Sequence, residues 1–268
     1  MIRRPIPPGW RVGLGVGVAA AVAALYLLLS WRVHAENPRD TTVPTLSQLA
    51  AGVGEIFVPE DGETLADLPV WEDIRATGRR FLLGLGIGVG LSFLAGVAMG
   101  TLTPVGAGCG PTLLFFGAVP PTAMLAVYYQ VFGIGESLFL ALIALGVFPL
   151  LAGGLYKSVL ADVPDHAVSK AYTLGASHAE VVWNVIVPQT LPRFLESTRL
   201  AAGLGLIFLI AGEWGFADVG FGYQLKLWSR IAAMDLAYPY LFLLGLFGLA
   251  VDRGLLWLRR WACPWWSE

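Results

Sequence analysis

Long apolar runs, separated by short polar segments, dominate the pattern of this chain. Between Arg80 and Lys157 the only charged residue is Glu136, and this stretch is far longer than the roughly 20 apolar residues that cross a bilayer once. The pattern therefore predicts an all-α membrane protein, a polytopic transmembrane helical bundle of about six spans. The predicted spans are residues 14–31, 81–103, 112–132, 137–157, 195–213 and 237–258.

The first apolar run, residues 14–31, follows Arg3, Arg4 and Arg11, and a cationic flank of this kind stays in the cytoplasm. The triplet Val33-His34-Ala35 resembles the cleavage site of a signal peptide, but the run is longer than the usual core of such a peptide. We interpret the run as a retained membrane anchor, with a cleaved signal peptide as the alternative.

Polar residues fill the segment 32–80, which holds nine of the 19 acidic residues and is predicted to be external. Its apolar residues are compatible either with an interfacial amphipathic helix or with a plain connecting loop; they are Leu46, Leu49, Ile56 and Phe57. On this topology both termini are cytoplasmic, and ten Lys and Arg residues lie inside against seven outside. The predicted parts are an anchor with an external segment (1–80), a transmembrane domain (81–260) with a cytoplasmic loop (158–194), and a tail (261–268).

The composition also favours a membrane protein over a soluble domain. Of the 268 residues, 56% are apolar and 13% are charged, which is about half the charged fraction of a soluble domain, and the mean hydropathy is +0.69. The net charge of −2 gives no indication of nucleic-acid binding. Cys109 and Cys263 are isolated from each other and from the three histidines, so neither a metal site nor a disulfide framework is predicted.

Glycines recur in the span 81–103. They form three small-xxx-small pairs, Gly84/Gly88, Gly86/Gly90 and Gly96/Gly100. Such pairs allow helix backbones to approach closely, which we interpret as their role. A nucleotide-binding loop is not favoured, because the G-x-G-x-x-G spacing and its strand-turn-helix context are missing.

The predicted cytoplasmic loop 158–194 contains the local signals of two short helices. Asp165 follows a proline and is expected to cap the first helix. Gly175 supplies a residue that adopts the left-handed conformation in which helices commonly end. An apolar face is expected on this helix at Val168, Ala171 and Tyr172.

The second helix of the pair is predicted to start at the capping box of Ser177 and Glu180 and to stop at Pro188. Its apolar residues Val181, Val182, Val185 and Ile186 fall on one side. A few residues would suffice to connect two spans, so a folded pair indicates either a docking surface for a partner or a hairpin on the lipid surface. Periodicity alone leaves both open, whereas a DNA-reading helix-turn-helix lacks its basic stripe.

The loop contains Ser169-Lys170-Ala171, Gly175 and Val185-Ile186-Val187-Pro188. These residues keep the spacing of a motif in the cytoplasmic loop of ABC-importer permeases, and the loop resembles that family. The family motif is Glu-Ala-Ala, three residues, glycine, nine residues and Ile-x-Leu-Pro. Leu174, Ala176 and Ser177 match as well. Ser169 stands where the family has its acid and Lys170 where it has alanine.

The resemblance extends to further stretches of the chain between residues 44 and 260. They are Leu46-Ser-Gln, Val119-Pro120-Pro121-Thr-Ala, Phe132-Gly-Ile-Gly-Glu136 and Ala211-Gly-Glu213-Trp214-Gly with Gly220-Phe-Gly-Tyr223. With them the chain resembles one branch of the family, the permeases of taurine, alkanesulfonate, nitrate and bicarbonate importers. Gly212 and Trp214 differ from the alanine and methionine usual in that branch.

The resemblance implies the fold of a type I ABC importer permease and a transport role, not an enzymatic one. It implies a bacterial inner-membrane assembly of two permease subunits, here a homodimer surrounded by lipid, with two cytoplasmic ATPase subunits and a periplasmic or lipid-anchored substrate-binding protein. ATP and Mg²⁺ then belong to the ATPase, and no cofactor or catalytic residue is expected in this chain. The expected substrate is a small anion such as nitrate, bicarbonate, taurine or a sulfonate.

The residues that the resemblance assigns to ATPase coupling lie in the helix pair. They are Ser169, Lys170, Ala171, Leu174, Gly175, Ala176, Ser177, Glu180 and Pro188.

Candidates for the translocation path are Pro120, Pro121, Glu213 and Trp214. The two prolines are expected to interrupt the span 112–132, and the freed carbonyls are tolerable only against protein or a water-filled cavity. A purely structural kink is the other interpretation of the prolines.

Acidic residues near the span ends have structural interpretations too. Glu213 is compatible with a buried ion pair to Arg79 or Arg80. Glu136 is interpreted as a solvated turn residue. Glu196 and Arg199 are predicted to pair on one helix face because they are three residues apart.

Two other classes of function are compatible with a polytopic chain. A secondary transporter or channel that works without an ATPase is the main alternative, and an intramembrane enzyme is the other. The helix-pair segment and the Pro-Pro segment show no repeat in the other half of the chain, which disfavours an inverted-repeat transporter. The spans also lack the paired acids or the His-rich face that such an enzyme needs.

Overall fold

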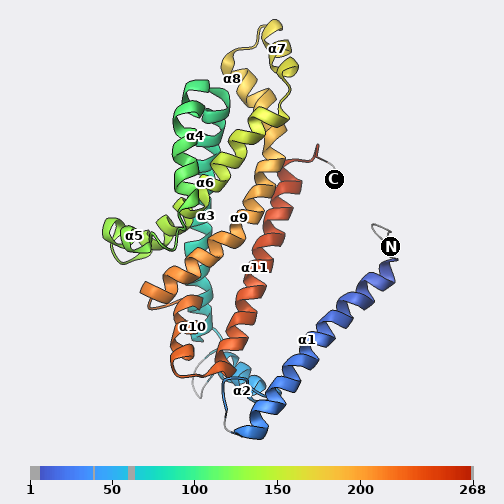
Figure 1. The fold of residues 1–268 in the computed structure, drawn as a ribbon, viewed down its shortest axis with the longest axis vertical. Coiled ribbons are helices and arrows are strands. Elements are labelled where there is room, and N and C mark those ends of the chain that lie inside the picture. Colours follow the sequence, from blue (N-terminus) through green and yellow to red (C-terminus); the bar gives the residue numbers. More distant parts are fainter. Residues whose placement is uncertain (1–6, 39, 60–63, 267–268) are drawn as a thin grey trace. The chain divides into compact units, whose positions relative to one another are not determined.

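A computed structural model describes residues 7–38, 40–59 and 64–266 (Figure 1). All regular secondary structure in these ranges is helical, which confirms the predicted all-α fold. The elements are α1 (Pro8–Glu36), α2 (Leu46–Phe57), α3 (Pro69–Thr101), α4 (Thr103–Ala118), α5 (Leu125–Phe132), α6 (Glu136–Asp162), α7 (Asp165–Thr173), α8 (His178–Val181), a π-helical turn (Val182–Ile186), α9 (Val187–Phe216), α10 (Phe221–Arg230) and α11 (Met234–Ala262).

Five helical stretches in the described residues are long and apolar enough to cross a membrane. They are Val12–Glu36, Pro69–Thr101, Glu136–Asp162, His178–Phe216 and Met234–Ala262. The fourth joins α8, the π-helical turn and α9 into one helix. The remaining predicted span, residues 112–132, is interrupted, as Pro120 and Pro121 predicted.

That predicted span divides between α4 and α5, and residues 119–124 separate them. Pro120 and Pro121 account for the break, since a proline ring lacks an N–H and clashes with the preceding turn. The helix α4 also starts earlier than the predicted span and includes residues 104–111, which lie between the predicted spans 81–103 and 112–132. Pro104 lies in its first turn, where no backbone N–H is needed.

Helix α3 starts at Pro69, whereas the predicted span started at residue 81. The extra turns form because polar residues of the predicted external segment are buried at helical spacing. Asp73, Thr77 and Arg80 are all buried, and their partners are described below. A hydropathy pattern misses such turns, since their polar side chains satisfy one another inside the protein.

The chain forms two compact units, Met1–Leu68 with Leu227–Leu241, and Pro69–Lys226 with Phe242–Glu268. In the first unit, the hydroxyl of Tyr26 in α1 donates to the carbonyl of Pro44 at 2.7 Å. A capping box of Thr45 and Gln48 then starts α2. Of the two interpretations of residues 46–57, the helix is therefore the one observed.

In the second unit α3, α6 and α9 pack around one apolar core (Figure 1). Glycines bring α3 against α6: a Cβ on Gly88 would lie 2.6 Å from Cγ2 of Val147, and one on Gly100 2.5 Å from Cβ of Val159. Gly84 and Gly96 approach α6 in the same way. Two of the three predicted pairs thus pack helices, whereas a Cβ on Gly86 or Gly90 would meet nothing within 4 Å.

We predict that Gly88→Leu lowers the stability of the folded chain by at least about 1–3 kcal/mol, the usual cost of overpacking a core. The added side chain has to displace Val147 or the backbone of Ala144, which would lie 3.0 Å from the new Cβ. The matched control is Gly86→Leu, on the open face of the same helix. Thermal unfolding in detergent measures both, and equal midpoints for the two variants would contradict the packing role.

Candidate functional site

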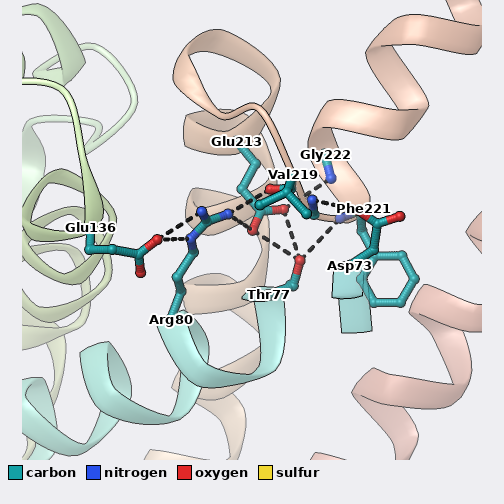
Figure 2. Close-up of polar contacts among 9 residues, drawn as sticks. Asp73, Thr77, Arg80, Glu136, Glu213, Val219, Phe221 and Gly222 are labelled. Atoms are coloured by element: carbon teal, nitrogen blue, oxygen red, sulfur yellow. Dashed lines mark hydrogen bonds and ion pairs between the residues drawn. The ribbon is translucent and has the colours of Figure 1, made fainter. Parts of the chain in front are cut away.

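A row of polar side chains on α3 forms the centre of a buried cluster. Asp73, Thr77 and Arg80 follow one another at helical spacing on one face. The guanidinium of Arg80 forms ion pairs with Glu213 in α9, at 3.0 Å, and with Glu136 at the start of α6, at 2.8 Å (Figure 2). One arginine therefore connects three long helices. These five residues are called the Arg80 cluster below.

The carboxylate of Glu213 is fully buried. Besides the ion pair with Arg80, it accepts a hydrogen bond from the hydroxyl of Thr77 at 2.9 Å and one from the backbone N–H of Gly222 at 3.0 Å. A carboxylate inside a protein is tolerated only when such partners replace its hydration. The three donors thus explain why an acid is stable at this depth.

The loop between α9 and α10 folds over this carboxylate. The backbone N–H of Gly220 donates to Asp73 at 2.7 Å, and that of Phe221 donates to the Thr77 hydroxyl at 3.0 Å (Figure 2). A Cβ on Gly220 or Gly222 would lie 2.6 Å from an atom of Glu213, and Gly220 also has a φ of +120°. Glycine is therefore required at both positions by the close approach of the loop.

Two of the sequence-based predictions concern residues of this cluster, Glu213 and Glu136. The ion pair of Glu213 with Arg80 is present, while Arg79, the other partner considered, is exposed. The interpretation of Glu136 as an ordinary solvated turn residue is wrong: its side chain is 50% exposed, but it pairs with Arg80. No local pattern predicts that contact, because the two residues are far apart in the sequence.

A second polar contact joins α9 to α11. Glu196 and Arg199 pair at 2.9 Å, as their spacing predicts. Glu196 also pairs with Arg259 at 2.7 Å, and Arg199 with Asp252 at 3.4 Å. The predicted helix-face pair is thus part of a network that fixes two helices together.

The helix pair α7–α8 projects beyond the ends of α4 and α6 (Figure 1, top). Gly175 has a φ of +86°, the left-handed conformation predicted for it. The predicted capping box is present, since the backbone N–H of Ser177 donates to Glu180 at 2.7 Å and the Ser177 hydroxyl accepts from the Glu180 backbone. Ala171 and Ala176 pack against the apolar core, which holds the turn between them in place.

Two details of this pair were predicted wrongly. Pro164, not Asp165, is the N-cap of α7, and Asp165 lies in the first turn without a side-chain cap. Pro188 does not stop the second helix, because the chain continues without a break into α9. The π-helical turn explains this: its wider ring pairs the N–H of Val187 with the carbonyl of Val182, which makes room for the proline.

The residues expected to couple to an ATPase are mostly exposed. Ser169, Lys170, Gly175, Ser177 and Glu180 all face outward. Leu174, at the turn between the two helices, is 84% exposed. The helix pair therefore presents a preformed surface with an apolar centre.

A cavity of about 1110 Å³ is lined by α3, α4, α6 and α9, by Tyr128 of α5 and by the segment between α4 and α5. Of the four path candidates, Pro121 lines it, whereas Pro120, Glu213 and Trp214 do not. Glu213 is enclosed in the Arg80 cluster, and the side chain of Trp214 is 43% exposed elsewhere. The structure therefore does not bring the four candidates together.

Metal ligands are not grouped in the part of the chain that the structure describes: no three His, Cys, Asp or Glu side chains are arranged to hold an ion. The features of the described residues that bear on function are the buried ion pairs, the exposed helix pair and the apolar cavity.

Comparison with known proteins adds a family. The profile described as binding-protein-dependent transport system inner membrane component matches residues 86–262. The chain is 29% identical to the taurine transport system permease protein TauC of Escherichia coli, and the match covers 97% of this chain and 94% of that protein. It is 25% identical to the nitrate import permease protein NrtB of Synechococcus elongatus, and this match covers 69% of this chain and 67% of that protein. A chain of the MetNI methionine ABC transporter in an inward-facing conformation shares the fold, with a TM-score of 0.59 at 18% identity over 72% of this chain and 93% of that one.

Proposed function

Since the chain belongs to the family of binding-protein-dependent transport system inner membrane components and is an ABC importer permease subunit, we propose that separate ATPase subunits drive it and that an external binding protein supplies its substrate. The observation that carries this proposal is the exposed helix pair α7–α8 with Leu174 at its turn. Short helices seated in a groove of a partner can transmit rigid-body motion. ATP and Mg²⁺ bind to that partner.

The topology of the proposal places the helix pair and both termini in the cytoplasm of a bacterium. In this arrangement α4 and α5 together provide the crossing that neither is long enough to make alone. The Arg80 cluster then lies near the external ends of α3, α6 and α9. A second copy of the chain completes the membrane path, with lipid around the pair.

The substrate class follows from the chemistry of the relatives' substrates. Taurine carries a sulfonate and nitrate is an oxyanion, and both names belong to permeases that resemble this chain. A small anion with a compact oxygen-bearing head group is therefore the proposed substrate.

Reconstituted transport tests this proposal. The chain is assembled in liposomes with a candidate ATPase and a candidate binding protein, and uptake of labelled taurine and nitrate is measured with and without ATP. We expect uptake of one of them only with ATP and the binding protein. Uptake that follows an ion gradient without an ATPase would instead establish a secondary transporter.

A further inference from the structure

The large cavity is lined by α3, α4, α6 and α9, which contribute residues at helical spacing, and also by Tyr128 of α5 and the segment between α4 and α5. Ala95 and Met99 come from α3, and Leu204 and Phe208 from α9. The walls from α4 and α6 are longer and include Cys109 on α4. Most of this lining is apolar, so its few polar groups decide which solutes it accepts.

Among the described residues that line this cavity, Lys157 on α6 is the only charged one. Its side chain is exposed, and no carboxylate in the described residues pairs with it. Thr112, Tyr128 and Tyr156 add hydroxyl groups, which can donate to an anion. A cation without a paired carboxylate beside apolar walls attracts anions, whereas those walls offer no competing charge.

The nearest acid along α6 does not cancel this charge. Asp162 pairs with Arg193 and accepts from the hydroxyl of Ser158. Asp162 also lies outside the lining of the cavity. Lys157 is therefore the formal charge that the described lining residues of this chain contribute to the cavity.

We infer that this cavity is an anion-accepting part of the translocation path and that Lys157 selects for negative charge within it. The inference rests on the proposed transport function and deepens it, since it assigns the charge selection to one residue of this chain. A sulfonate or another oxyanion would approach the ammonium group of Lys157 and pack its apolar part against the walls.

Cys109 provides a test that needs no known substrate. It is an exposed free cysteine in the lining, whereas Cys263 is buried. In the full-length permease in nanodiscs, the rate of its modification by an anionic reagent, sulfonatoethyl methanethiosulfonate, is divided by the rate for a cationic one, trimethylammonioethyl methanethiosulfonate. Any effect of Lys157 on the thiolate fraction of Cys109 acts on both rates and leaves the ratio unchanged.

We expect Lys157→Gln to lower this ratio about tenfold, because the loss of one charge slows the anion and speeds the cation. Lys157→Arg keeps the charge and should keep the ratio. The control Arg253→Gln removes an exposed cation outside the cavity lining and should also leave it unchanged. An unchanged ratio in Lys157→Gln would overturn the inference, as would a Cys109 that neither reagent reaches.

Uptake in the reconstituted importer separates this inference from the proposed function. Lys157→Gln should reduce ATP-driven taurine or nitrate uptake while binding of the ATPase persists. If the wild-type assembly transports neither solute, the proposed substrate fails, and the labelling ratio still reports on Lys157.

Discussion

Gly175→Trp is expected to reduce ATP-driven uptake to the level measured without ATP. Gly175 has a φ of +86°, where a residue with a Cβ costs about 1–2 kcal/mol. A Cβ would meet nothing within 4 Å inside the chain, so the indole would project from the helix pair toward the proposed partner. The measurements are substrate uptake and the amount of ATPase that co-purifies with the permease.

Gly175→Asn is the matched variant, because asparagine adopts the left-handed conformation more readily than most residues and its side chain is short. It should keep most of the uptake. If Gly175→Trp transports as well as the wild type, the helix pair does not dock on the ATPase. If both variants fail equally, the requirement is for glycine itself and not for free space at the surface.

Local signals in the sequence predicted the helix pair well, because the chemistry that forms it acts over a few residues. Gly175, Ser177 and Glu180 adopt the predicted cap geometries. The end at Pro188 could not be predicted in the same way. Proline usually stops a helix, and only the shifted hydrogen bonds of a π-helical turn let this one continue.

Hydropathy located the apolar segments but not where their helices begin. The start of α3 at Pro69 depends on polar side chains that are satisfied by residues far along the chain, so an apolar window excludes it. The division of the predicted span 112–132 was predicted from Pro120 and Pro121 and not from hydropathy, because its apolar run is continuous.

Of the buried cluster, the sequence analysis identified Glu213, Arg80 and Glu136 but not Asp73 or Thr77. Arg80 was one of two partners considered for Glu213, and the burial of Asp73 and Thr77 was not foreseen. The two glycines that flank Phe221 were a further signal. Their spacing after Glu213 is explained only when the loop is seen to approach the carboxylate closely enough to exclude a Cβ.

Arg80→Met is expected to destabilise the permease by about 3–5 kcal/mol, the cost of leaving one partner of a buried ion pair without the other. Glu213 would keep the hydroxyl of Thr77 and the N–H of Gly222 as donors, but no cation would balance its charge. The link between α3 and Glu136 at the start of α6 would be lost as well. Thermal unfolding in detergent and the yield of monodisperse protein measure the effect.

Arg79→Met is the matched control, because it removes the same side chain from the neighbouring, exposed position of α3 and should leave the unfolding midpoint almost unchanged. The double variant Arg80→Met/Glu213→Gln tests the electrostatic cause. A neutral amide at position 213 needs no cation, so this variant should recover part of the lost stability. If the double variant is no more stable than Arg80→Met, the loss comes from the packing of the guanidinium, which lies 4.5 Å from the centre of the Phe139 ring, and not from the unpaired charge of Glu213.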